Sequence, residues 1–110
     1  MDQLQLFLYR KSARQRIILY LMARGYRFDE LSKMTADELK SIEVPNELGL
    51  CIAKNQVLSA TNENNLVFSY PNGRKMGKGD FFRILTQASM KVLGRSITVG
   101  EFQSYVNKAN

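Results

Sequence analysis

The sequence has no histidine, no tryptophan and a single cysteine among its 110 residues. Without histidine, zinc sites of the Cys-His type, histidine-based triads and histidine general acids are excluded. The lone Cys51 cannot form a disulfide within the chain, which favours a reducing compartment, and its apolar neighbours predict a small core residue. No P-loop, GxGxxG or HExxH pattern is present, and we expect neither a metal site nor a cofactor.

Long apolar runs are also missing. None approaches the ~18 residues that a membrane-spanning helix needs, so we expect no membrane partner. The short apolar patch near the start follows an acid and precedes bases, which is the wrong order for a secretory signal, and we expect a cytoplasmic protein. The length, with 45% hydrophobic and 24% charged residues, predicts one compact domain over residues 1–110.

Positive charge is what the sequence has in excess. Sixteen Lys and Arg against ten Asp and Glu give a net charge of +6. An excess of this size on a small domain favours a polyanionic partner, with nucleic acid as the first candidate. A basic surface without any partner is the alternative, because net charge does not say where the charges lie.

Helical patterns dominate the chain and predict a mainly α fold. Thr35 with Glu38, and Thr98 with Glu101, match the capping box, while Gly25 and Gly94 are typical helix stops. Residues 1–11 are either a helical extension or a flexible start. We expect Asp29 and Asp80 to cap helices, and one or two short strands at residues 42–44 and 66–70. The expected helices cover residues 12–24, 29–34, 35 onward, 45–59, 80–93 and 98–106.

Four segments, in chain order, resemble the catalytic domain of the tyrosine recombinases, the phage-integrase family. "ARGYRFDELSKMT" resembles the first family box, with Arg27 at the position of its first catalytic arginine. The others are "EVPNELGLCIAKNQ", "NNLVFSYPNGRKMGKGDFFRILTQASMKVLG" and "SITVGEFQSYV". Together they cover most of residues 14–106, so the resemblance implies a single domain built as a trimmed recombinase core.

The departures from the family pattern concern its chemistry. Gly100 falls where the family has its histidine and Gln103 where it has its second arginine. Only "KSIE" spans the place of the hairpin with the catalytic lysine, and the chain ends before the nucleophilic tyrosine of the family. Each loss removes a group that must act together with the others. We therefore expect no enzymatic activity, and we expect Tyr105 to be a packing residue.

The candidate DNA-binding residues are basic side chains near helix starts. A glycine-containing turn that leads into a helix N-terminus suits phosphate oxygens, and one further arginine follows a turn later. Arg27 either joins them or pairs locally with Asp29 or Glu30. A run of bases at residues 10–16 either is a solvated helix face or flanks the duplex. The candidates are Arg27, Arg74, Lys75, Lys78 and Arg83.

The sequence is compatible with two functions. The first is a non-catalytic DNA-binding protein of phage or mobile-element type, acting as a regulator or accessory factor. The second is a protein-interaction module that binds or inhibits a recombinase or a host factor, or that associates with itself. The second follows from the missing hairpin and C-terminal part of the family, whose loss would leave apolar surface and strand edges uncovered.

Overall fold

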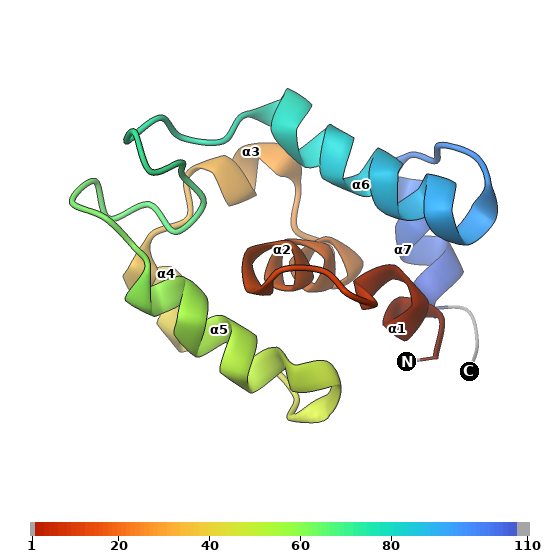
Figure 1. The fold of residues 1–110 in the computed structure, drawn as a ribbon, viewed down its shortest axis with the longest axis horizontal. Helices are drawn as coiled ribbons and strands as arrows, with labels where there is room; N and C mark the ends of the chain where they lie inside the picture. The colour runs from red at the N-terminus through yellow and green to blue at the C-terminus, as the bar shows by residue number, and fades with distance from the viewer. Residues whose placement is uncertain (1, 108–110) are drawn as a thin grey trace.

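A computed structural model describes residues 2–107; Met1 and residues 108–110 of the expected domain lie outside this range. Within it, seven α-helices and one short 3₁₀ helix form a single mainly α unit (Figure 1), as the helical patterns predict. The elements are α1 (Asp2–Leu8), α2 (Ala13–Ala23), α3 (Phe28–Ser32), α4 (Ala36–Ser41), η1 (Glu47–Gly49), α5 (Leu50–Ser59), α6 (Lys78–Leu93) and α7 (Val99–Asn107).

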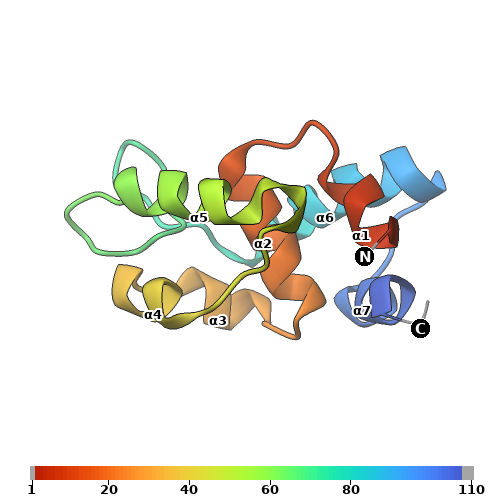
Figure 2. The same ribbon diagram turned by 90° about the horizontal axis from the view of Figure 1, so that it is seen from below.

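Helix α2 is the centre of the core. Its residues 17–23 are all buried, which requires neighbours on every side of the helix. Figure 1 shows α2 between α6 and α5, and it also contacts α1 and α7. In the turned view, α3 and α4 lie on the other side of α2 from α1 (Figure 2), and α3 also contacts α6. None of the helices described in residues 2–107 is long and apolar enough to cross a membrane.

Several expected helix ends are confirmed. The Thr35 hydroxyl accepts from the Glu38 amide at 3.2 Å while the Glu38 carboxylate accepts from the Thr35 amide at 3.1 Å. Thr98 and Glu101 form the same reciprocal pair before α7. Gly94, with φ at 76°, ends α6 in the left-handed conformation. These contacts satisfy amides and carbonyls that a helix end leaves without partners.

The two expected acidic N-caps, Asp29 and Asp80, are wrong by two or three positions. Helix α6 begins at Lys78, and the Asp80 carboxylate accepts from the amide of Gly77 at 2.9 Å. Helix α3 begins at Phe28, and the Glu30 carboxylate accepts from the backbone amide of Arg27, the residue just before the helix. An acid at the third helical position can reach back to the cap residue, so the acids lie inside the helices that they stabilise.

The N-terminal segment is a packed helix rather than a flexible start. Leu4, Phe7 and Leu8 of α1 are buried in the common core. Arg10, at φ 58°, turns the chain sharply between α1 and α2. A residue with a Cβ rarely adopts this conformation, and it prevents one continuous helix from residue 2 to residue 23.

The expected strands are reduced to two isolated bridges in residues 2–107, one between Thr35 and Leu66 and one between Ser69 and Lys75. The buried residues of the second candidate, such as Phe68, instead fill the core from an irregular loop. The expected helix over residues 45–59 is also divided, because Gly49 adopts φ 67° just before α5. Cys51 is half-buried rather than a core residue, and its thiol lies 3.0 Å from the Asn46 side-chain oxygen.

Two aromatic clusters stabilise opposite ends of α6. Near its first turns, the Phe81 ring lies 6.0 Å from Phe28 and 6.1 Å from Phe68. At the end where α1 and α7 meet (Figure 1), the Phe7 ring lies 4.9 Å from the ring of Phe102 and also contacts Tyr105. The packing role expected for Tyr105 is confirmed. Edge-on and offset ring pairs of this kind add to the free energy gained by burial.

Candidate nucleic-acid interface

Basic side chains from three parts of the chain meet around one tyrosine and one aspartate at the start of α6. The Tyr70 hydroxyl donates to Asp80 at 2.8 Å. Arg83 lies 3.2 Å from the same carboxylate and 3.3 Å from the Tyr70 oxygen, and Arg74 lies 3.6 Å from the other carboxylate oxygen. Arg14 of α2 also reaches this group. We name Arg14, Tyr70, Arg74, Asp80 and Arg83 the Tyr70 cluster.

The Tyr70 ring is a second contact surface for two of these arginines. The guanidinium carbon of Arg74 lies 4.4 Å from the ring centroid and that of Arg14 lies 5.1 Å from it. Arg14 also donates to the carbonyl of Ser69 at 3.2 Å. A cation near an aromatic face is attracted by the ring, so Tyr70 holds both guanidiniums in place without removing their charge.

The turn at residues 70–74 explains why Arg74 returns to Tyr70. The Gly73 amide donates to the Tyr70 carbonyl at 2.9 Å, and the Tyr70 amide donates to the Arg74 carbonyl at 2.8 Å. Gly73 has φ 87°, a conformation that glycine adopts readily. The Asn72 side chain accepts from the Arg74 amide at 2.9 Å and closes the turn. The "PNGR" turn predicted from the sequence is therefore confirmed.

Asp80 is the anionic centre of the cluster, and its side chain is only 13% exposed. The Gly77 amide lowers the pKa of its carboxyl most, followed by the Tyr70 hydroxyl and then by Arg74 and Arg83. Hydrogen bonds and positive neighbours both favour the charged form. The carboxylate therefore stays ionised at neutral pH, where it orients two guanidiniums and offsets one positive charge.

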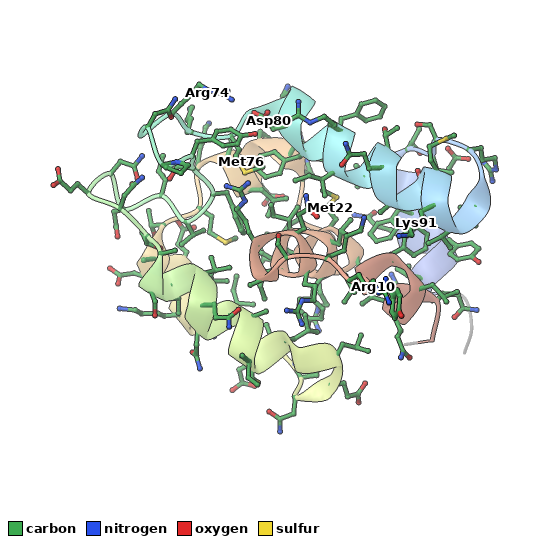
Figure 3. All side chains as sticks on the ribbon, in the orientation of Figure 1. Arg10, Met22, Arg74, Met76, Asp80 and Lys91 are labelled. Carbon is green, nitrogen blue, oxygen red and sulfur yellow. The ribbon has the colours of Figure 1, made fainter. Side chains whose placement is uncertain are left out.

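Four of the five candidate residues belong to the segment from Arg74 to Arg83, around the start of α6. Arg74 and Arg83 join at Asp80, and their side chains are each 60% exposed. Figure 3 shows Arg74 beside the start of α6, where Asp80 lies. Lys75 and Lys78 occupy the short segment between Arg74 and Asp80, and both are exposed.

Arg27 pairs with a carboxylate other than Asp80, although its neighbour Phe28 packs against Phe81 at the start of α6. Its guanidinium lies 3.4 Å from the Asp29 carboxylate and its side chain is 75% exposed. Glu30, one of the two local partners considered for it, instead accepts from the Arg27 backbone amide. Arg27 thus forms an exposed local pair at the start of α3 rather than a third ion pair with Asp80.

Three members of the Tyr70 cluster are not among the candidate DNA-binding residues. Arg14 belongs to the basic run at residues 10–16, Tyr70 lies in a predicted strand, and Asp80 is predicted only as a helix cap. The contact between Arg14 and Ser69 joins residues that are 55 positions apart, so no local pattern indicates it. The tyrosine immediately before "PNGR" is the one available signal, because the turn brings its ring back to the arginine.

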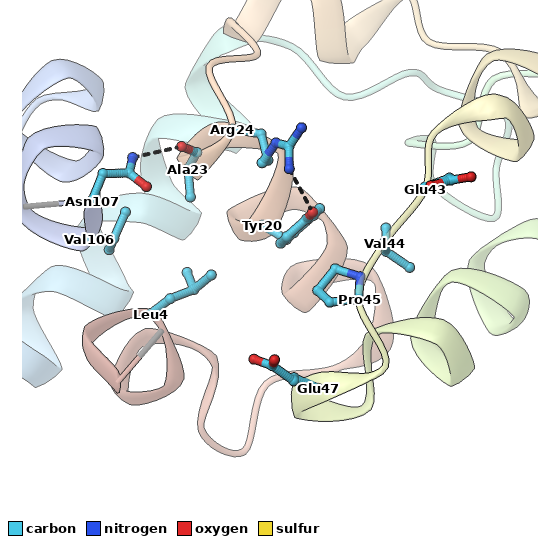
Figure 4. A pocket seen from close by; sticks show the side chains of 10 residues that line it. All are labelled: Leu4, Tyr20, Ala23, Arg24, Glu43, Val44, Pro45, Glu47, Val106 and Asn107. Atoms are coloured by element: carbon cyan, nitrogen blue, oxygen red, sulfur yellow. Dashed lines mark hydrogen bonds between the residues drawn. The ribbon is translucent and has the colours of Figure 1, made fainter. Parts of the chain in front are cut away.

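A separate groove lies between α1, α2, α7 and the link before η1 (Figure 4), and its volume is about 540 Å³. Arg24 on one side donates to the Tyr20 hydroxyl at 3.5 Å. Glu43 and Glu47 on the other side carry negative charge. Carboxylates repel phosphate, so this groove does not suit a polyanion. Its lining is Leu4, Tyr20, Ala23, Arg24, Glu43, Val44, Pro45, Glu47, Val106 and Asn107.

Among the side chains that the structure describes, at residues 3–107, no three of Cys, Asp or Glu form a group that could hold a metal ion. Comparison with known proteins found no matching family model, no matching curated protein and no matching solved structure.

Proposed function

We propose that this domain is a non-catalytic DNA-binding module that holds the phosphate backbone with the Tyr70 cluster, Lys75 and Lys78. One observation carries the proposal: Arg74 and Arg83 share one carboxylate at the start of α6, Arg14 lies against the Tyr70 ring beside them, and Lys75 and Lys78 are exposed in the segment between Arg74 and Arg83. The positive charge that Asp80 does not offset lies mainly on exposed side chains. Backbone phosphates are the partners that such a surface recognises without reading a base sequence.

The internal contacts of the cluster favour this role. Asp80 and Tyr70 hold the guanidiniums of Arg74 and Arg83 while leaving more than half of each side chain exposed. An ordered guanidinium loses less conformational freedom when a phosphate binds, and its planar fork can donate two hydrogen bonds to one phosphate. Lys75 and Lys78 add point charges beside it.

DNA is favoured over other polyanions by the resemblance of four sequence segments to the phage integrases. The same resemblance suggests a regulator or accessory factor of phage or mobile-element type, working in the cytoplasm of a bacterial host. The missing family histidine and second arginine suggest that it binds DNA without cutting it. Arg27 contributes to this surface only if its pair with Asp29 opens on binding.

A salt titration tests the proposal directly. Binding of a short labelled duplex, followed by fluorescence anisotropy, should weaken steeply as salt rises, because bound cations release counterions. The double variant Arg74→Gln with Lys78→Gln should reduce the slope of log Kd against log salt by about two. The matched control is Lys33→Gln with Lys40→Gln, which removes the same charge from exposed positions at the ends of α3 and α4.

The control pair should change the slope much less than the test pair. If the wild-type protein is folded by circular dichroism and does not bind the duplex at low salt, the proposal is refuted. If both pairs reduce the slope equally, DNA binding is a property of net charge and the Tyr70 cluster has no special part in it.

A protein-binding surface is the second candidate, and exposed apolar side chains on α6 favour it. Phe82 and Met90 are about half exposed on the helix that also carries Arg83. Apolar residues on one exposed helix can bind a partner or a second copy of the chain. Light scattering should then show self-association that Phe82→Ser reduces; a strict monomer that binds DNA would favour the first candidate.

A further inference from the structure

A second group of basic residues surrounds the link between α1 and α2. A cavity of about 340 Å³ opens there, which we name the elbow pocket. Three of its lining side chains are cationic and none is acidic. Its lining is Gln5, Leu8, Tyr9, Arg10, Lys11, Arg16 and Leu48.

Arg16 lines this pocket, and only one of its side-chain nitrogens has a hydrogen-bond partner among the described residues. Its Nε atom is buried and has no partner among the described residues, and its Nη1 makes one long bond of 3.4 Å to the Leu48 carbonyl. A Cβ atom at Gly49 would lie only 2.9 Å from that Nη1. The guanidinium is thus closely held between α2 and η1, where a buried unpaired donor costs free energy.

The positive charge around the pocket is not compensated. The side chains described, those of residues 3–107, form four ion pairs, and none of them includes Arg10, Lys11, Arg16 or Lys91. Burial lowers the pKa of Lys11, and the nearby charge of Lys91 lowers it further. Lys11 and Lys91 line one neighbouring cavity, and Figure 3 shows Arg10 and Lys91 in the part of the molecule away from Arg74. Like charges held together without a carboxylate favour a bound anion.

The chemistry of the pocket suits a phosphate group attached to a small flat molecule. Arginine donors match phosphate oxygens in pairs, and lysine adds a third charge. Tyr9 is exposed at the rim, with the guanidinium of Arg10 5.3 Å from its ring centroid, and could stack on an aromatic group. The volume lies at the low end of the range for ligand pockets, about 300 to 1,000 Å³.

We propose that the elbow pocket binds the phosphate group of a small phosphorylated molecule of nucleotide size. The Tyr70 cluster has Asp80 to satisfy its guanidiniums, whereas the elbow pocket has no such group in its lining. The anion would supply that missing partner. This site is separate from the DNA surface proposed above and does not depend on it.

The test uses inorganic pyrophosphate and adenosine diphosphate as probes, at constant ionic strength and with amide chemical shifts as the readout. Both probes should give saturable shifts at residues 8–11, 16 and 48. The double variant Arg10→Asn with Lys11→Gln should weaken binding about tenfold or more, because charged hydrogen bonds are lost. Lys33→Gln with Lys40→Gln, which changes net charge equally, should weaken it by less than about twofold.

A second arm separates a small ligand from the DNA backbone. Arg74→Gln with Lys78→Gln should leave adenosine diphosphate binding unchanged, although the same pair should weaken duplex binding if the DNA proposal holds. The elbow proposal is overturned if neither probe saturates at millimolar concentration, or if the control pair weakens binding as much as the elbow pair. It is also overturned if only duplex DNA shifts these residues, because the cations would then belong to the DNA surface.

Discussion

The Tyr70 cluster and the elbow pocket are both basic, yet they use their charges differently. In the cluster, Asp80 and the Tyr70 ring hold the arginines in a network of short contacts. In the elbow pocket, Arg16 keeps a buried donor without a partner among the described residues, and no described ion pair includes a cation of the pocket. Charge that a carboxylate already orders suits an extended polyanion, whereas unpaired charge around a small cavity suits a compact one.

The two regions also lie over different parts of the core. Phe81 follows Asp80 directly and packs against Phe28 and Phe68 beneath the cluster. Phe7 lies in α1, two residues before Tyr9, and packs against Phe102. Each basic surface is therefore supported by its own aromatic contacts. Damage to one set of rings should affect the nearer surface more than the farther one.

The largest expected effect comes from truncating these rings. Phe81→Ala and Phe7→Ala should each reduce the free energy of unfolding by about 3 to 5 kcal/mol, because both side chains are fully buried. Urea unfolding measures the loss. The matched control is Phe82→Ala on the same helix, whose exposed ring should cost about 1 kcal/mol or less.

Binding measurements on the folded fraction would extend this test. Phe81→Ala should weaken duplex binding more than adenosine diphosphate binding, and Phe7→Ala should do the reverse. Equal losses of both activities in both variants would show that the two surfaces are not independently supported.

Gly49→Ala should have the next largest effect. Gly49 has φ 67°, and a Cβ there would lie 2.9 Å from the Arg16 guanidinium, so the new methyl group meets both backbone strain and a close neighbour. We expect a loss of about 1 to 2 kcal/mol in the free energy of unfolding. Gly79→Ala is the control, because a Cβ in this helical position meets nothing within 4 Å and alanine favours a helix.

The same pair of variants bears on the elbow pocket. Gly49→Ala should displace the Arg16 guanidinium and reduce pyrophosphate binding, while Gly79→Ala should leave it unchanged. Normal pyrophosphate affinity in a folded Gly49→Ala protein would show that Arg16 has no part in anion binding.

Asp80→Asn should remove a part of the stability that depends on pH. The pKa of Asp80 in the folded chain lies below its ordinary value of 3.8, chiefly because the Gly77 amide donates to it. A lowered folded pKa adds stability that is complete at neutral pH and is lost as pH falls from about 4 through the lowered value. In urea titrations, Asp80→Asn should therefore be less stable than wild type at neutral pH.

The difference should become smaller in acid. Glu101, whose pKa is lowered chiefly by the Thr98 amide, is present in both proteins. Its contribution to the free energy of unfolding therefore falls in acid in wild type and variant alike. A difference between wild type and Asp80→Asn that is constant down to about pH 3 would contradict the assigned role of the Asp80 charge.

Sequence patterns within a few residues predicted much of the fold. The features that they did not predict depend on contacts between residues far apart in the chain. Capping at Thr35 and Thr98 needs residues only three positions apart, and both boxes are present. A strand at residues 66–70 needs a partner from elsewhere in the chain, and the described residues offer only single bridges. Asp80 was predicted as a cap because its type fits, whereas its position inside α6 depends on the loop before it.

The basic surfaces were only partly predictable for the same reason. Arg74 and Arg83 come close because one turn and one helix connect them, which a sequence pattern can show. Arg14 reaches Tyr70 only through the tertiary fold. The elbow pocket did have a signal in the sequence: residues 3–28 contain six Lys and Arg and no Asp or Glu. The cations of this segment have no carboxylate partner within the segment. The contact between Arg16 and the Leu48 carbonyl, however, could not be predicted from the sequence.

The smallest expected effect concerns Arg10, the left-handed residue of the elbow. Arg10→Asn should raise the free energy of unfolding by about 0.5 kcal/mol, because asparagine tolerates φ near 58° better than arginine does. Thermal or urea unfolding would measure the gain. The same substitution should weaken pyrophosphate binding, so stability and affinity should move in opposite directions. A variant with both a lower free energy of unfolding and a lower pyrophosphate affinity would show that Arg10 serves the fold. Arg10 would then no longer support the distinction between the ordered Tyr70 cluster and an anion-binding elbow pocket.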